Sequence, residues 1–103
     1  MSVDCAADVV NRMRSESQAI RGYGVARIGL FGSFRRGEAH ASSDVDLLVE
    51  FEPGRKSFDN FMKLGFFLES LLGRPVELLT PESLSPYIGP RILGEVDYVA
   101  FGG

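Results

Sequence analysis

Hydrophobic residues recur at helical spacing in two stretches of the chain. In residues 3–21 they return every three or four positions between Arg, Glu, Gln and Asn, and glycines follow. Residues 57–73 show the same period, with Ser57 or Asp59 near the start and Gly73 at the end. The pattern therefore predicts two long helices, one at the N-terminus and one after the middle of the chain.

Three shorter apolar runs have the length of β-strands and are bounded by glycine, proline or polar residues. They cover residues 25–32, 45–51 and 74–80. Between the first two, residues 33–43 predict a turn and a short helix. Residues 81–99 are interrupted by proline and predict short helical turns followed by a tail.

The order of these elements is α-β-(short α)-β-α-β-α. It predicts an α+β fold, a two-layer α/β arrangement in which a small mixed sheet packs on helices. With 103 residues the chain is long enough for one domain and too short for two, so we expect a single domain over residues 1–103.

Composition and charge narrow the class of protein. Hydrophobic residues make up 45% and charged residues 24%, as in ordinary soluble proteins. The net charge of −3 argues against a nucleic-acid partner, because phosphate binders usually carry a basic excess. Cys5 is the only cysteine, which excludes an internal disulfide, and no apolar run is long enough to cross a membrane. We therefore expect a cytoplasmic protein with no membrane partner.

The helix predicted for residues 57–73 is more apolar than a small sheet requires. At 100° per residue its large apolar side chains spread over roughly 260° of the circumference, whereas packing on a sheet needs about 100°. Two explanations remain open. Another chain covers the excess, or the C-terminal segment with Tyr87, Ile88, Ile92 and Leu93 folds over it.

Two carboxylates, Asp44 and Asp46, stand one residue apart at the head of the second strand. Because side chains alternate along a strand, both share one face with Leu48. Two like charges about 5 Å apart repel by roughly 3 kcal/mol at an effective dielectric constant near 20. A divalent cation between them removes that cost, and hard cations prefer oxygen ligands. The spacing alone is also typical of a turn cap followed by a solvent-facing residue.

A turn with the residues of a phosphate site precedes this pair. Gly32 and Ser33 follow the first strand directly, where a helix start offers backbone N–H groups to an anion. Gly32 permits a close approach of the backbone, and the Ser33 hydroxyl can donate to a phosphate oxygen. Arg35 and Arg36 lie within reach of the turn. A phosphate-binding turn opposite paired carboxylates is typical of phosphoryl or nucleotidyl transfer.

The stretch GSFRRGEAHASSDVDLLVEF, residues 32–51, resembles a known signature. It is similar to the Gly-Ser-x10-Asp-x-Asp motif of the minimal nucleotidyltransferases, small members of the DNA polymerase beta-like nucleotidyltransferase superfamily. The segments RGEA and SDVDLLVEFEPG match neighbouring parts of the family pattern, and LLGRPVELLTPESLSPYI is similar to its third strand and the segment after it. The resemblance covers most of the chain.

The resemblance implies roles for five residues of the motif. Asp44 and Asp46 would bind two Mg²⁺ ions. Gly32 and Ser33 would hold the triphosphate of a nucleotide, with Arg36 facing the phosphates. Arg35 is expected to be a solvated neighbour.

The family also implies a third carboxylate on the adjacent strand, which completes the metal site and helps to deprotonate the acceptor hydroxyl. It falls at Glu77 in VELL, where most relatives resemble VDLV. Glutamate adds one methylene and extends the reach of the carboxylate by about 1 Å. The alternative for Glu77 is a solvent-facing residue on a strand whose Val76 and Leu78 point inward.

Two functions from different classes follow from the resemblance. The first is a Mg²⁺-dependent transferase that moves AMP from ATP onto a hydroxyl of a helical HEPN-type partner protein, as the antitoxin of a toxin–antitoxin pair. The second is a non-catalytic module that neutralises such a partner by contact. A metal-dependent phosphatase or nuclease shares the carboxylates but leaves the Gly-Ser turn unexplained. The oligomeric state stays open, and a homodimer is one candidate.

Overall fold

A four-stranded mixed sheet forms the centre of the computed structural model, which describes residues 2–101. The strands lie in the order β3-β2-β1-β4. Strand β1 is antiparallel to both β2 and β4, and β2 is parallel to β3. Their bounds are Val25–Phe31 for β1, Val45–Phe51 for β2, Val76–Leu79 for β3 and Asp97–Tyr98 for β4.

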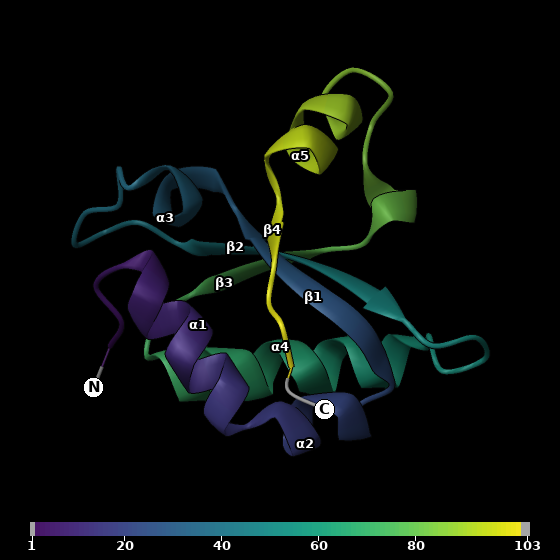
Figure 1. Ribbon diagram of the computed structural model, residues 1–103. Coiled ribbons are helices and arrows are strands. Elements are labelled where there is room, and N and C mark those ends of the chain that lie inside the picture. The colour runs from purple at the N-terminus through teal and green to yellow at the C-terminus, as the bar shows by residue number, and fades with distance from the viewer. Residues whose placement is uncertain (1, 102–103) are drawn as a thin grey trace.

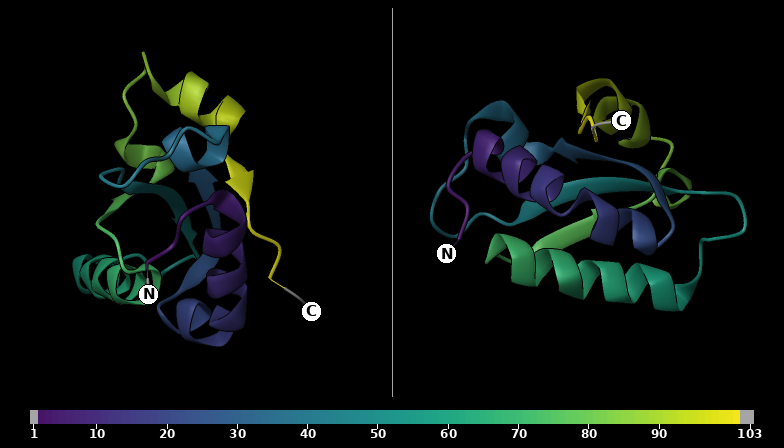
Figure 2. Two further views of the ribbon diagram at one scale, coloured as in Figure 1. Left: turned by 90° about the vertical axis from the view of Figure 1, so that its left-hand side faces the viewer. Right: turned by 60° about the horizontal axis from the view of Figure 1, so that its bottom comes forward.

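Helices lie on both sides of this sheet. The helices are α1 (Ala6–Ser15), α2 (Ser17–Gly22), α3 (Gly32–Arg36), α4 (Phe58–Leu72) and α5 (Gly89–Glu95), with a 3₁₀ helix, η1, at Pro81–Ser83. Helices α1, α2 and α4 lie together on one side, and α5 lies on the side away from α4 (Figures 1 and 2). The predicted α+β class with a small mixed sheet is confirmed. In residues 2–101 no helix combines the length and hydropathy needed to span a membrane.

The hydrophobic core fills the space between the sheet and these three helices. On β2, Val45, Leu47 and Val49 are fully buried, as the alternation of side chains predicts. Helix α4 contributes a buried stripe at helical spacing: Leu64, Leu68 and Leu72. This packing leaves the even-numbered residues of β2, including Asp46, on the opposite face of the sheet.

The ends of α4 follow the predicted capping residues. The Ser57 hydroxyl accepts a hydrogen bond from the Asn60 N–H at 3.1 Å, which satisfies one of the free amides of the first turn. At the other end Gly73 adopts a left-handed conformation with φ 69°. Helix α4 then connects the parallel strands β2 and β3 as a crossover, and its Glu69 carboxylate accepts a hydrogen bond from the Val76 N–H at 3.0 Å.

Two predicted elements differ from the structure. The single helix expected over residues 3–21 breaks at Glu16, where φ is −118° and the N–H bonds to the Met13 carbonyl, three residues back. The C-terminal tail contains a short strand instead of remaining unpaired, since β4 pairs with β1 through Gly29↔Tyr98 and Leu30↔Asp97. A two-residue strand is too short to leave a periodic pattern in a sequence.

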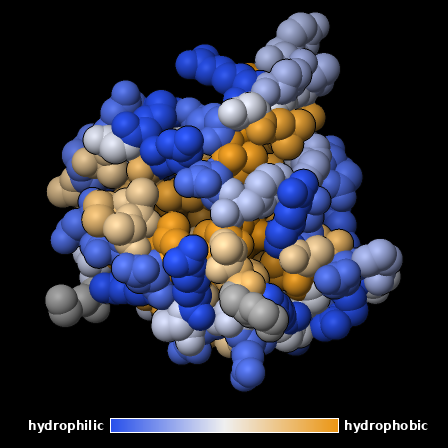
Figure 3. Space-filling view, in the orientation of Figure 1, coloured by the Kyte–Doolittle hydropathy of each residue, from blue (hydrophilic) through white to orange (hydrophobic). Residues whose placement is uncertain are grey.

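The excess apolar surface of α4 remains exposed. Phe58 and Phe66 are 68% and 65% exposed, and Met62 lies between them on the same stripe. Helix α5, which carries Ile92 and Leu93, lies on the side of the sheet away from α4 (Figure 1). Of the two explanations left open, the one in which the segment with Tyr87, Ile88, Ile92 and Leu93 folds over α4 therefore does not hold. Tyr87, Ile88 and Leu93 are themselves exposed. In the same orientation, hydrophobic side chains gather near the middle of the molecule inside a hydrophilic rim (Figure 3).

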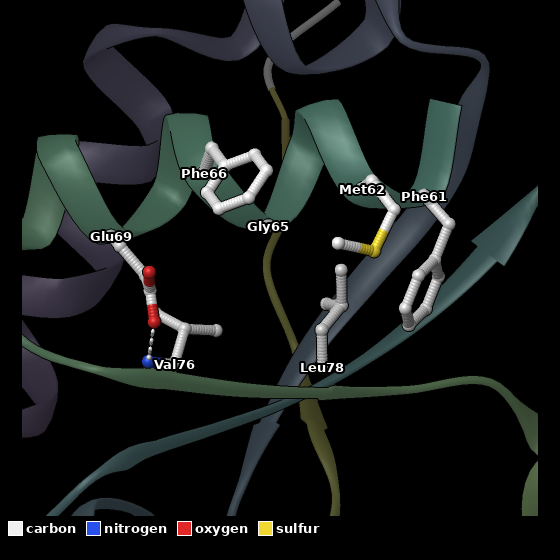
Figure 4. Close-up of a pocket in the computed structure, with 7 residues that line it drawn as sticks. All are labelled: Phe61, Met62, Gly65, Phe66, Glu69, Val76 and Leu78. Atoms are coloured by element: carbon white, nitrogen blue, oxygen red, sulfur yellow. Dashed lines mark hydrogen bonds between the residues drawn. The ribbon is translucent and has the colours of Figure 1, made fainter. Parts of the chain in front are cut away.

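A cavity of about 270 Å³ lies between α4 and β3. Phe61, Met62 and Phe66 of α4 and Val76 and Leu78 of β3 point toward it (Figure 4). It is on the helix side of the sheet, so it is separate from the face that carries Asp46.

Candidate active site

Pairing between β1 and β2 brings the Gly-Ser turn against the Asp46 carboxylate. Phe31, the last residue of β1, pairs with Asp46, so Gly32 lies directly beside the Asp46 side chain. Gly32 has φ 74°, a conformation that other residues rarely adopt. A Cβ at this position would overlap the Asp46 carboxylate oxygen Oδ2. Glycine is therefore required at position 32 both by the backbone and by the carboxylate.

The parallel pairing of β2 with β3 brings in the third predicted carboxylate. Asp46 and Glu77 are register partners, with their side chains on the same face. Asp44 precedes β2 and is exposed, whereas Asp46 is half-buried. The structure thus places Asp46 and Glu77 as neighbours, and Asp44 is near enough to raise the pKa of Asp46.

The pKa of Asp46 is raised to about 6. Burial makes the largest contribution, followed by a hydrogen bond to the Glu77 carboxyl and repulsion from Glu77 and Asp44; Arg36 opposes the increase. Burial and repulsion therefore both favour the uncharged carboxyl of Asp46 over the carboxylate.

The charge and donor type of these side chains fit a hard divalent cation such as Mg²⁺. They supply oxygen atoms only, and the pKa of Asp46 is raised by burial first and by repulsion from Glu77 and Asp44 second, both of which a bound cation would offset. Within residues 2–101, however, no three His, Cys, Asp or Glu side chains are arranged so that they could hold a metal ion. The carboxylates are neighbours but do not converge on one point, and binding of two ions stays a prediction.

Arg36 is held by two carboxylates. Its Nε donates to Glu38 at 2.9 Å and its guanidinium also donates to Glu95 at 2.9 Å. The other oxygen of Glu95 accepts a hydrogen bond from the Gly32 N–H at 2.9 Å. The pKa of Glu95 is lowered by the Gly32 amide and then by Arg36, so its carboxylate is charged at neutral pH.

Glu95 is absent from the residues that the motif predicts. It is the last residue of α5 and lies 63 positions from Gly32, and no local pattern links the two. Two further residues of the motif, Ser33 and Arg35, lie in α3. Ser33 is partly exposed at the start of α3, and Arg35 makes a long, exposed ion pair with Asp97 at 3.9 Å.

Comparison with known proteins identifies this arrangement. A sequence profile of the nucleotidyltransferase domain matches residues 8–99. The chain belongs to the nucleotidyltransferase family. The predicted enzyme class is confirmed, and the minimal nucleotidyltransferase resemblance is confirmed as well.

Relatives of this nucleotidyltransferase include proteins named as protein adenylyltransferases. The protein adenylyltransferase MntA of Thermococcus cleftensis is 48% identical over 77 residues, which cover 75% of this chain and 77% of the relative. A solved minimal nucleotidyltransferase is 34% identical, with a TM-score of 0.69 over 85% of this chain and 93% of that chain. A complex of a tri-AMPylated HEPN toxin with an MNT antitoxin from Shewanella oneidensis shares the fold, with 18% identity and a TM-score of 0.62 over 90% of this chain and 73% of that chain.

The raised pKa of Asp46 predicts a stability effect in the absence of divalent cations. The folded state favours the protonated carboxyl, so this contribution is present below about pH 4 and is lost as pH rises through about 6. Asp46→Asn removes the cost of burying a charge here as well as the repulsion from Glu77 and Asp44. At pH 7.5 in EDTA we expect it to raise the free energy of unfolding by roughly 1 kcal/mol, a value reduced for partial exposure, and the Tm by about 4–8 °C.

Thermal melts at pH 4.5 and pH 7.5 check this effect, since the gain should be larger at the higher pH. Glu52→Gln, an exposed carboxylate outside the site, is the matched control and should change the Tm little. A drop in Tm for Asp46→Asn would mean that the charged carboxylate stabilises the fold.

Proposed function

We propose that this nucleotidyltransferase moves AMP from ATP onto a hydroxyl of a helical HEPN-type partner and acts as the antitoxin of that pair. The observation that carries the proposal is the close contact of Gly32 with Asp46, which joins a phosphate-binding turn to the carboxylates. The names of the relatives, a protein adenylyltransferase and an MNT antitoxin bound to an AMPylated toxin, support AMP and this class of partner.

Different residues of the motif would bind the triphosphate and the metal ion. The Ser33 hydroxyl and the backbone of the turn would bind the triphosphate, and Arg36 would add positive charge near the phosphates. Asp44 and Asp46 would hold Mg²⁺. When bound, the cation would supply positive charge that offsets the negative charge of the carboxylates and the phosphates.

Glu77 would receive the proton of the acceptor hydroxyl. The hydroxyl oxygen then forms a bond to the α-phosphorus, and the bond from that phosphorus to the α–β bridging oxygen breaks. Pyrophosphate leaves with the bonding electrons, and the acceptor carries AMP. Glu77 lies on β3, an edge strand of the sheet, next to Asp46 on β2. An acceptor from another protein can approach this edge.

A non-catalytic antitoxin is the second candidate, and one contact favours it. The Gly32 N–H and Arg36 already bind the Glu95 carboxylate, so two of the groups assigned to phosphate are occupied within the chain. Such a protein would bind its partner through an exposed surface without transferring a nucleotide.

The decisive experiment combines the chain, a HEPN partner encoded beside it, ATP labelled at the α-phosphate and Mg²⁺. Under the proposal the label appears on the partner, and pyrophosphate is released in equal amount. Label that stays on ATP while the two proteins form a complex would favour the non-catalytic antitoxin.

Nucleotide binding should depend on both aspartates of the motif. We expect Asp44→Ala combined with Asp46→Ala to weaken binding of ATP with Mg²⁺ at least about tenfold, or about 1.4 kcal/mol. Calorimetry measures the affinity, with Glu52→Gln as the control. An unchanged affinity would remove these residues from the proposed metal site.

A further inference from the structure

The Glu95 carboxylate lies where the proposed function needs an anion from outside. One oxygen accepts the Gly32 N–H at 2.9 Å and the other accepts the Arg36 guanidinium at 2.9 Å. The Gly32 N–H belongs to the turn to which the nucleotide triphosphate is assigned, and Arg36, at the end of α3, is the cation assigned to the same phosphates. A carboxylate and a phosphate group present the same kind of acceptor, two or more charged oxygens, to such donors.

We propose that Glu95 is an internal competitor of the nucleotide, which holds the phosphate-binding turn until a triphosphate displaces it. The inference rests on the proposed function, because it takes the turn as the phosphate site. It adds a control on nucleotide affinity, located in α5, that the motif does not contain.

The surroundings of Gly32 leave little room for both anions. Its N–H is bound to Glu95, and the Asp46 carboxylate lies against its Cα, where not even a Cβ would fit. Arg36 is the cation shared by Glu95 and Glu38. A triphosphate that kept Glu95 in place would add its charge to this group of carboxylates, so repulsion favours release of Glu95.

Glu95 can leave the turn without unfolding its helix. It is the final residue of α5, and the next residue, Val96, is already extended, with φ −61° and ψ 136°. Its side chain is 23% exposed, so rotation about its own bonds can bring the carboxylate into water. The cost of displacement is then the loss of two charge-assisted hydrogen bonds, which the phosphate replaces.

Two matched substitutions test the proposal. Glu95→Gln keeps the size of the side chain and removes its charge, whereas Glu38→Gln removes the other carboxylate on Arg36 and leaves the Gly32 N–H untouched. Calorimetry with inorganic tripolyphosphate, and separately with ATP and Mg²⁺, should show Glu95→Gln binding about fivefold or more tightly than wild type, the scale of one nearby like charge in a solvated site. Glu38→Gln should change the affinity by less than about twofold, because its carboxylate is largely in water.

Equal or weaker binding by Glu95→Gln would overturn the proposal and make Glu95 a structural support of the turn. An equal gain for Glu38→Gln would also overturn it, because general charge removal would then explain the result. The wild-type chain gives a test that needs no substitution. On saturation with tripolyphosphate, the NMR signals of the Gly32 amide and the Glu95 carboxyl carbon should both shift, and an unmoved Glu95 signal would contradict displacement.

These readouts separate the two proposals. Tighter tripolyphosphate binding by Glu95→Gln with no transfer of AMP to any partner would support the competitor and reject the transferase. Transfer of AMP by the wild type, together with an unchanged tripolyphosphate affinity in Glu95→Gln, would support the transferase and reject the competitor.

Discussion

Glu77→Gln should reduce transfer of AMP to the partner by about 100-fold or more and leave ATP binding nearly intact. The loss is the usual scale for removing a positioned general base. The substitution keeps the size and hydrogen bonding of the side chain but removes the charge that would accept the proton of the hydroxyl. Single-turnover transfer measures the rate, and calorimetry with ATP measures the binding.

Glu77→Asp is the matched control, because it keeps the charge of the carboxylate and shortens the side chain by one methylene. The family resemblance implies Asp at this position, so we expect this change to retain or improve transfer. Binding of the partner should survive both substitutions, because Glu77 lies in the site and not on the exposed stripe of α4. Transfer by Glu77→Gln at the wild-type rate would reduce Glu77 to a surface residue of β3.

The second large effect is expected for Gly32→Ala. The added Cβ would meet the Asp46 carboxylate, and the backbone would have to keep φ at 74°. We expect ATP binding and transfer to fall below detection and the free energy of unfolding to drop by about 2–3 kcal/mol, from strain plus displacement of Asp46.

Gly54→Ala isolates the backbone part of this effect. Gly54 has φ 78°, and nothing lies within 4 Å of the Cβ that would be added. Its substitution should cost about 1 kcal/mol in stability and leave binding and transfer unchanged. If both substitutions behave alike in denaturant melts and in the transfer assay, the contact between Gly32 and Asp46 has no functional importance.

The sequence was most informative where local signals agree. Helix α4 was expected within residues 57–73 and spans Phe58–Leu72, because Ser57 and Gly73 mark its ends by capping geometry. Strand β2 begins and ends where its apolar alternation does. Alternation also predicts that Val45, Leu47 and Val49 face the core and that Asp46 lies on the opposite face, although Leu48 on that opposite face is fully buried as well.

Long-range features could not be obtained in this way. Nothing near Glu95 in the sequence indicates that its carboxylate reaches the Gly32 amide, because the contact depends on how α5 returns to the sheet. The break at Glu16 and the short strand β4 depend on tertiary packing in the same way. The partner of the exposed α4 stripe, the number of metal ions and the single domain over residues 1–103 stay predictions.

The strand order gives the proposed nucleotide-binding residues and Glu77 different numbers of neighbouring strands. Asp46 lies on β2, which is bordered by β1 and β3, and Gly32 follows β1, which is bordered by β2 and β4. Glu77 lies on β3, a four-residue strand at the margin that has a neighbour on one side only. The nucleotide would therefore bind to residues held by the two inner strands. Glu77, which would contact the acceptor, lies on an edge strand that can shift slightly toward different hydroxyls without moving Asp46 or Gly32.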